Sequence, residues 1–320
     1  MTKASAVVTG GAGFIGSHLV DRLTAEGHRV LVIDNLVSGD ARLPYLDAAG
    51  AVLEKVDIRE ARAAEIIEAF RPSEVYHLAA QADVRRSVAD PIYDAGVNIL
   101  GTLQILQAAA EIGARVVSAS SGGCIYGDAE AAALPLDESS PRNPDSPYGI
   151  SKSVMDDYLH FYGATRGLQF VNLALGNVYG PRQDPLGEAG VVAIFGLRLL
   201  KGEPCVIFGD GHQTRDFIYV ADVAEAFFLG ASRGEGKILN IGSGVETSVN
   251  ELYGALAEIC GSDQEPRYDP PRAGELQRSC LNSALAKNVL GWAPMVDLKD
   301  GLRRTVDFLR EQLENQTASN

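Results

Sequence analysis

Cysteine is scarce in this sequence of 320 residues, which contains four. Cys124, Cys205, Cys260 and Cys280 lie far apart and show neither the spacing of zinc ligands nor a CxxC pair. Neither a disulfide framework nor a thiolate metal centre is therefore expected, and we predict reduced thiols in a cytoplasmic protein that holds no metal. No stretch resembling a signal peptide precedes the first strand-like run, which fits the same location.

Positive charge is also in short supply. Lysine and arginine number 28 against 42 aspartates and glutamates, which gives a net charge of −14 and a pI near 4.8. Such a chain repels phosphate backbones and anionic lipids, so we expect neither nucleic acid nor a membrane as a partner. The apolar run VVAIFGLRLL at 191–200 contains Arg198 and is shorter than the roughly 18 residues that a membrane-spanning helix needs.

Short apolar runs alternate with helix-like segments in the first half of the chain. Runs rich in β-branched residues occupy 4–10, 29–34, 51–57, 74–80, 114–120 and 168–175, and helical patterns cover 14–26, 62–70, 92–110 and 148–165. The runs are continuously apolar, as expected for strands that are covered on both faces. This alternation predicts an α/β fold of the Rossmann type, with a doubly wound parallel sheet.

After about residue 176, loops rich in glycine and proline separate shorter elements. We expect helices at 190–201, 221–232, 248–260, 283–290 and 299–314, and strands at 204–208, 216–219 and 237–241. The sequence thus predicts a Rossmann domain over 1–175 and a smaller α/β substrate-binding domain mainly over 176–320, with segments that can interleave. No flexible linker separates the two, so a ligand is expected in the crevice between them.

The segment VVTGGAGFIGSHLV (7–20) places a glycine turn between a strand and a helix. Gly11, Gly13 and Gly16 fit G-x-G-x-x-G, and Gly10, Gly13 and Gly16 fit G-x-x-G-x-x-G. Such glycines permit a tight turn and a close approach of the backbone to a pyrophosphate. Asp34 ends the next strand, where an acid can accept hydrogen bonds from an adenosine ribose and repels a 2′-phosphate. The pattern therefore favours NAD over NADP.

A tyrosine and a lysine stand one helical turn apart in SPYGISK (146–152). Pro147 suits the first turn of a helix, so Tyr148 and Lys152 are expected on one face of it. An ammonium group beside a phenol favours the phenolate, which can take a proton from an alcohol near neutral pH. The pair by itself is also compatible with an ordinary amphipathic helix start.

Nine segments occur in an order that resembles one family: TGGAGFIG, DNLVSG, VDIRE, HLAAQADV, VNILGT, SSGGCIYGD, SPYGISK, GNVYGPRQ and RDFIYVADVAEA. Over about residues 5–310 they resemble the extended short-chain dehydrogenases/reductases of the NAD-dependent epimerase/dehydratase family. Within that family, the UDP-glucose (UDP-galactose) 4-epimerases are the most similar group. The resemblance implies an NAD-dependent isomerase of carbohydrate metabolism. It would invert C4 of UDP-glucose or UDP-galactose, or of their N-acetylated analogues, through a transient 4-keto sugar.

The resemblance also implies the NAD contacts. The residues at matching positions are Gly10, Gly13, Phe14, Ile15, Gly16, Asp34, Asn35, Asp57, Ile58, Leu78, Ala79, Ala80, Gln81, Asn98, Tyr148 and Lys152. Asp57 and Ile58 would lie by the adenine, and Asn98 would brace the backbone of the active site. Tyr148 would be the catalytic base, and Lys152 would hold the nicotinamide ribose.

The serine expected near the substrate hydroxyl is Ser121, with Ser120 as the alternative. Many relatives carry this serine or threonine four residues before the tyrosine of YG, where this chain has Gly122. Related dehydratases and decarboxylases have acidic residues between that position and YG, because elimination needs a proton donor and a base. Gly122, Gly123 and Cys124 supply no acid, which favours removal and return of a hydride without elimination.

An acidic protein needs arginines to hold the diphosphate of a UDP-sugar, because guanidinium groups bind phosphate oxygens in pairs. By resemblance, Arg215 and Arg272 would contact the diphosphate together with Asn177, and Phe208 would lie near the uracil.

Two further positions bear on the choice of substrate. Ser279 stands where relatives restricted to non-acetylated hexoses often carry tyrosine, so a 2-acetamido sugar also fits. Arg182 could accept a carboxylate, so a UDP-glucuronate 4-epimerase is also compatible with the sequence. So are a nucleotide-sugar dehydrogenase or reductase that releases its cofactor, and an NAD-binding sensor without activity.

Two helical segments predict self-association. Apolar stripes follow the segments 92–110 (Ile99, Leu103, Leu106) and 148–165 (Met155, Leu159, Tyr162). Such stripes can pair across a two-fold axis or face the sheet. Because similar family members dimerise in this way, we expect a homodimer.

Overall fold

The structure, a computed structural model, describes residues 4–128, 134–185, 190–272 and 276–318. The strands are β1 (Ser5–Thr9), β2 (Arg29–Asp34), β3 (Val52–Lys55), β4 (Glu74–His77), β5 (Arg115–Ser121), β6 (Phe170–Leu175), β7 (Asn177–Tyr179), β8 (Val206–Phe208), β9 (Thr214–Tyr219), β10 (Lys237–Ile241), β11 (Glu246–Ser248) and β12 (Arg267–Asp269).

The helices follow the same order along the chain. They are α1 (Phe14–Ala25), α2 (Leu43–Ala49), α3 (Ala61–Phe70), α4 (Val84–Ala89), α5 (Pro91–Ala95), the π-helix η1 (Gly96–Gly101), α6 (Thr102–Ile112), α7 (Gly122–Ile125), α8 (Pro147–Arg166), α9 (Val191–Leu200), α10 (Val220–Gly230), α11 (Val249–Cys260), α12 (Ala284–Leu290) and α13 (Leu298–Ala318). None of the helices in the described residues is both long enough and apolar enough to span a membrane.

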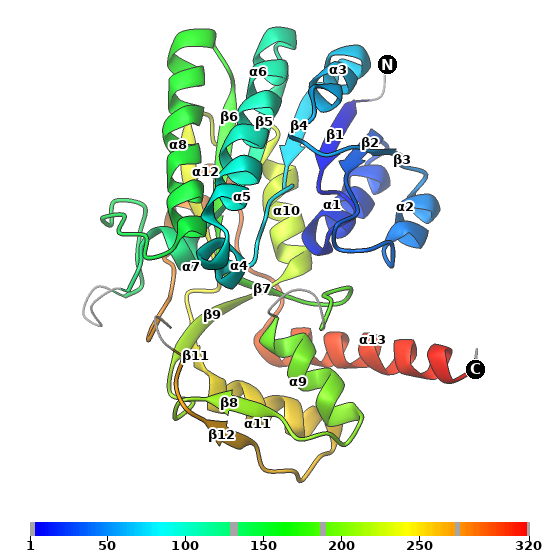
Figure 1. Ribbon diagram of the computed structural model, residues 1–320, viewed down its shortest axis with the longest axis vertical. Coiled ribbons are helices and arrows are strands. Elements are labelled where there is room, and N and C mark those ends of the chain that lie inside the picture. Colours follow the sequence, from blue (N-terminus) through cyan, green and yellow to red (C-terminus); the bar gives the residue numbers. More distant parts are fainter. Residues whose placement is uncertain (1–3, 129–133, 186–189, 273–275, 319–320) are drawn as a thin grey trace.

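A seven-stranded sheet forms the larger part of the molecule, in the order β10-β6-β5-β4-β1-β2-β3 (Figure 1). Every pairing in it is parallel. The chain runs outward from β1 to β3 and then crosses back to β4, so the strand order reverses between β1 and β4. The predicted Rossmann-type, doubly wound sheet is confirmed, and such a reversal is where ligands bind in this architecture.

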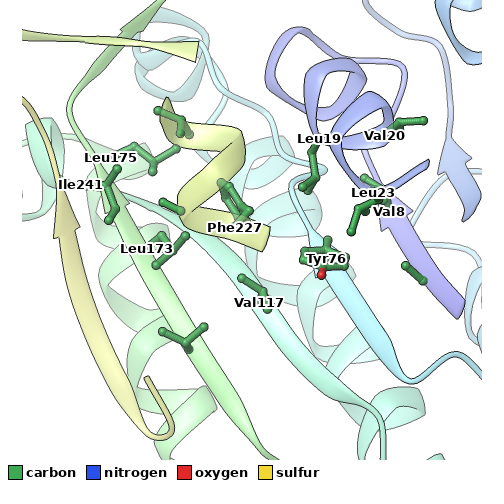
Figure 2. Close-up of a cluster of buried hydrophobic side chains, with 14 of the residues drawn as sticks. Val8, Leu19, Val20, Leu23, Tyr76, Val117, Leu173, Leu175, Phe227 and Ile241 are labelled. Atoms are coloured by element: carbon green, nitrogen blue, oxygen red, sulfur yellow. The ribbon is translucent and has the colours of Figure 1, made fainter. Parts of the chain in front are cut away.

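Two hydrophobic cores cover the two faces of this sheet. Successive strand residues point to opposite faces, so Val7 packs with α3, α6 and α8, while Val8 packs with α1, α10 and α12. Figure 2 shows part of the second core, in which Phe227 of α10 and Leu173 of β6 are buried together. The continuous apolar runs in the sequence reflect this coverage of both faces.

The smaller part of the molecule lies beyond the carboxyl ends of the sheet strands (Figure 1). It contains a three-stranded sheet in the order β11-β9-β7 and the parallel pair β12-β8. Helices α9, α11 and α13 pack with these strands around a separate core that includes Tyr179, Leu252 and Leu302. The predicted smaller α/β unit therefore has its own hydrophobic interior.

Some segments after residue 175 return to the large sheet. Strand β10 pairs with β6, and α10 packs against α1. Leu239 and Ile241 of β10 point to one face and are fully buried in the core that α1, α10 and α12 cover, and Asn240 is fully buried on the opposite face. Residues 220–241 thus lie with the sheet rather than with the smaller part, and the segments interleave.

The segment expected to be one helix at 92–110 is helical throughout, but its hydrogen-bond pattern changes to that of a π-helix in η1, between α5 and α6. The π-helical turn places Asn98 where its side chain reaches the loop after β4, which an uninterrupted α-helix would redirect. Three of the six residues in the predicted dimer stripes point inward. Leu106, Met155 and Leu159 are buried in the core beneath α6 and α8, so they face the sheet.

The core in Figure 2 generates a stability prediction. Leu173→Ala removes a fully buried side chain and should lower the free energy of unfolding by about 2–5 kcal/mol, because a cavity remains. Met295, which is 84% exposed, provides the control, and Met295→Ala should change the free energy of unfolding by less than about 0.5 kcal/mol. Urea unfolding followed by circular dichroism measures both. Equal losses in the two variants would contradict this account of the core.

Candidate active site

A cavity of about 690 Å³ opens between the carboxyl ends of the large sheet and the smaller part of the molecule. Most of the sequence-predicted site residues line it: Gly10, Gly13, Phe14, Ile15, Gly16, Asp34, Asn35, Asp57, Ile58, Leu78, Ala79, Ala80, Gln81, Ser120, Ser121, Tyr148, Lys152, Asn177 and Arg272. The volume falls within the range of small-molecule and cofactor sites. The fold therefore gathers residues that are far apart in the sequence around one space.

The glycines of the turn after β1 allow the backbone to pack closely at the start of α1. Gly10 has φ +71°, and a Cβ atom there would lie 2.7 Å from the backbone nitrogen of Ala79. A Cβ atom on Gly16 would collide with the Gly10 carbonyl oxygen and lie 2.8 Å from the Gly11 Cα. Helix α1 begins at Phe14 without a side-chain cap, so its first N–H groups are left to hold an anion.

Two carboxylates line the cavity at the ends of β2 and β3, Asp34 as the last residue of β2 and Asp57 just after β3. Asp34 accepts hydrogen bonds from the backbone N–H groups of Ala12 (3.0 Å) and Leu36 (2.8 Å), and burial raises its pKa. Asp57 accepts from Asn35 Nδ2 at 2.9 Å, and its hydrogen bonds with Arg59 hold its pKa well below the usual range. An acid at Asp34 suits a ribose with a free 2′-hydroxyl and disfavours a 2′-phosphate.

The start of α8 is fixed by two serines. Ser146 Oγ caps the helix by accepting from the Gly149 N–H at 3.2 Å, with Pro147 in the first turn. Ser87 Oγ accepts from the N–H of Tyr148 at 3.1 Å, so the backbone of the tyrosine is held from α4 as well. The local sequence therefore begins the helix where the expected base must stand.

Tyr148 and Lys152 lie on one face of α8, as the spacing predicts. Lys152 Nζ is 5.8 Å from the centroid of the Tyr148 ring and donates to the Ala119 carbonyl oxygen at 2.9 Å. The lysine is only 5% exposed. Burial lowers its pKa to about 8, and the charges of Asp94 and Asp156 act against that shift. An ammonium group with a depressed pKa beside a phenol in a cavity is typical of proton-transfer chemistry.

Both predicted serines line the cavity at the end of β5. Ser120 is nearly buried, and its Oγ has no hydrogen-bond partner among the residues that the structure describes. A buried hydroxyl of this kind is satisfied when a ligand binds. At Gly122, where many relatives carry the hydroxyl, a Cβ atom would lie 2.5 Å from Leu281 Cδ1 and 3.2 Å from the Ala174 carbonyl oxygen. Packing against Leu281 thus explains why glycine stands there.

Asn98 is placed behind the cavity wall rather than in it. Its Oδ1 accepts from the Gln81 N–H, and its Nδ2 donates to the Gln81 carbonyl oxygen, both at 2.9 Å. The amide thus satisfies both backbone groups of a residue in the loop that follows β4. This geometry agrees with the bracing role expected for Asn98, whereas a direct contact with a cofactor is not supported.

The residues expected at the nucleotide of the substrate are only partly brought together. Asn177 and Arg272 line the cavity, and the Arg272 guanidinium lies 3.7 Å above the centroid of the Phe208 ring. Arg215 donates to the Thr214 carbonyl oxygen at 2.8 Å. Arg215 lies outside the cavity lining. Burial raises the pKa of the Cys124 thiol in the cavity wall, and a hydrogen bond with Ser121 and, more weakly, the Arg215 charge oppose that shift.

Arg182 and Ser279 lie outside the cavity lining. Arg182 has a left-handed backbone (φ +68°), and its guanidinium pairs with Asp21 at 2.7 Å and stacks 3.8 Å above the centroid of the Tyr45 ring. Its expected contact with a substrate carboxylate has no support in this geometry. Ser279 is buried, so it does not widen the cavity.

Sequence reasoning missed several residues of the wall, among them Arg85, Arg86 and Tyr93. They follow the loop after β4, whose position at the carboxyl edge could have pointed to them. It also missed Asp94, which is fully buried beside the site. Asp94 and Asn98 stand four residues apart, a spacing that places two helical side chains on one face.

The glycine turn generates a prediction about cofactor retention. Gly16→Ala should lower the NAD content of the purified protein at least tenfold, because the added methyl group meets backbone atoms that cannot move aside cheaply. Gly254 is also helical, and a Cβ atom there meets nothing within 4 Å, so Gly254→Ala is the matched control and should retain NAD. NAD released on denaturation can be quantified by chromatography. Normal NAD content in Gly16→Ala would be incompatible with the cradle described above.

Three comparisons agree on the family of this chain. Residues 6–242 match the model of the NAD dependent epimerase/dehydratase family. The UDP-glucose 4-epimerase of Mycolicibacterium smegmatis is 47% identical over 310 residues, which cover 96% of this chain and 98% of that protein. The Thermotoga maritima UDP-glucose 4-epimerase, solved with UDP-glucose, superposes with a TM-score of 0.93 at 45% identity and covers 97% of this chain and 99% of its own.

A second solved structure concerns the cofactor. The Thermus thermophilus UDP-glucose 4-epimerase, solved in complex with NAD, superposes with a TM-score of 0.89 at 43% identity. The match covers 96% of this chain and 99% of that one. Together with the glycine cradle and the Tyr148–Lys152 pair, these matches establish that the chain belongs to the NAD-dependent epimerase/dehydratase family.

Proposed function

We propose that this protein is an NAD-dependent UDP-sugar 4-epimerase that interconverts UDP-glucose and UDP-galactose. The observation that carries the proposal is the position of Tyr148 and Lys152 in one cavity, whose wall extends from the glycine cradle to Asn177 and Arg272. A single space can therefore hold a dinucleotide and a nucleotide sugar on either side of a proton acceptor. The names of the relatives at 45–47% identity support the same substrate.

The described residues fit NAD. Gly10 and Gly16 let the turn after β1 pack closely against the loop after β4 and the start of α1, and Asp34 stands where a ribose hydroxyl needs an acceptor. When bound, the oxidised nicotinamide would supply the acceptor and later the donor of a hydride. Tyr148 and Lys152 would then lie at the nicotinamide end of the dinucleotide.

The side chains of this protein would move the proton. The phenolate of Tyr148 would take the proton from the sugar 4-hydroxyl while the C4–H bond breaks, and a 4-keto sugar would result. Lys152 would stabilise the negative charge on the phenolate oxygen of Tyr148. The hydroxyl of Ser121 or Ser120 would bind the same sugar oxygen. After the keto sugar turns over in the cavity, Tyr148 would return the proton as hydrogen is added to the other face of C4.

The absence of an acid at the end of β5 distinguishes this reaction from elimination. Gly122, Gly123 and Cys124 follow Ser121, and none of them can protonate a leaving hydroxyl as a carboxylic acid would. The sugar is therefore oxidised and reduced at C4 without loss of water or carbon dioxide. A net dehydrogenase would need to exchange its cofactor at each turnover, and NAD retained during purification would argue for epimerisation instead.

The nucleotide end of the substrate is assigned to Asn177, Arg272, Arg215 and Phe208. Arg272 would bind the diphosphate while stacking on Phe208, and Arg215 would add a second positive charge. UDP-glucose ranks above UDP-glucuronate because Arg182 is already paired with Asp21.

We also propose a cytoplasmic homodimer. Leu100 of η1 is 61% exposed and Phe161 of α8 is 54% exposed, and these two elements pack side by side. An apolar surface of this kind on neighbouring helices suits pairing across a two-fold axis. The four cysteines are free thiols, as a reducing compartment requires. Sedimentation of the purified protein at twice the monomer mass would support the dimer, and a monomer at all concentrations would refute it.

The central prediction concerns the base. Tyr148→Phe should reduce turnover of UDP-glucose to UDP-galactose by at least about 10²-fold, because only the acidic hydroxyl is removed. NAD content and UDP binding should stay normal. Tyr158→Phe, on the same helix but against the core, is the matched control and should turn over normally. Proton NMR of the sugar products measures both rates, and a fully active Tyr148→Phe would show that another group takes the proton.

A further inference from the structure

Asp94 of α5 is a carboxylate with no exposed surface. Its Oδ1 accepts hydrogen bonds from Gln81 Nε2 at 3.0 Å and from Asn98 Nδ2 at 2.9 Å. Its Oδ2 accepts from Ser151 Oγ at 2.7 Å. A buried carboxylate is costly unless donors surround it, and here three side chains supply them.

These donors come from three different parts of the site. Gln81 belongs to the loop at 78–81 that lines the cavity, which we call the β4 loop. Asn98 stands on the π-helical turn and holds the backbone of Gln81. Ser151 precedes Lys152 on α8. One carboxylate thus joins the cofactor side of the cavity to the helix that carries the acid–base pair.

The titratable groups around Lys152 differ in charge and in their other hydrogen-bond and ion-pair partners. Tyr148 and Asp156 approach it from α8, His77 from β4 and Asp94 from α5. Burial lowers the pKa of His77 to about 3, so it stays neutral. Asp156 forms an ion pair with Arg142 at 3.0 Å, and the guanidinium offsets much of the negative charge of Asp156.

Asp94 differs from Asp156 because its three hydrogen-bond donors are uncharged. Its hydrogen bond with Ser151 brings its negative charge close to Lys152, the next residue of α8, and this charge opposes the effect of burial on the pKa of Lys152.

We propose that Asp94 is a positioning residue that fixes α8, and with it Lys152, against the β4 loop and places a negative charge near the buried ammonium group. The proposal rests on the proposed function only for the role that Lys152 plays in turnover. The sign follows from the charges. A neighbouring anion favours the ammonium form, so without it Lys152 should lose its proton at lower pH.

The test is the titration of Lys152 in the protein purified with its NAD. The protein is labelled with carbon-13 at the lysine ε position, and the Lys152 resonance is identified by its absence in Lys152→Met. In Asp94→Asn this resonance should titrate at least about one pH unit lower than in the parent protein. Asp90→Asn, which keeps an exposed cap on the same helix, is the matched control and should leave the titration unchanged.

Two outcomes would overturn the proposal. The first is a Lys152 titration that is the same in Asp94→Asn as in the parent. The second applies if Asp94→Asn does not fold. The double variant with Lys152→Met removes both charges and should fold again. If the double variant does not fold either, the role of Asp94 is purely structural. Because the titration needs no turnover, a shifted Lys152 in a protein that does not epimerise would count against the proposed function alone.

Discussion

A positive charge lies inside this protein, on the ammonium group of Lys152, and the surrounding groups keep it there. Burial alone would favour loss of the proton and lowers the pKa to about 8. The Ala119 carbonyl oxygen accepts its hydrogen bond, and the carboxylates of Asp94 and Asp156 oppose the effect of burial. The chemistry proposed for Tyr148 depends on that balance, because an uncharged amine would not stabilise a phenolate.

The fold determines which elements bring these groups to the site. The strand order reverses between β1 and β4, so the glycine turn after β1 and the loop after β4 open onto one crevice. Helix α8 begins at the same edge, where Ser146 and Ser87 hold its first turn. The smaller part of the molecule then closes the cavity with Asn177 and Arg272. Packing on both faces of the sheet thus determines the relative positions of the reacting groups.

The sequence predicted what depends on local pattern and missed what depends on side-chain direction. Continuous apolar runs identified the sheet, and the glycine spacing located the cradle, because both follow from neighbouring residues. The left-handed backbone of Arg182 directs its guanidinium to Asp21, which the motif does not reveal. Leu106 and Leu159 fit a dimer stripe and a core stripe equally well, and only the packed sheet decides between them. Asp94 escaped notice because its donors come from separate segments of the chain.

The most direct test of the account follows the hydrogen at C4 of the sugar. UDP-glucose that carries deuterium at C4 is incubated with the purified protein, and the product is examined by NMR and mass spectrometry. The account predicts UDP-galactose that keeps its deuterium at C4, because the hydrogen leaves and returns within one cavity. UDP-galactose that has lost the label to water, or a product that has lost water from the sugar, would contradict it.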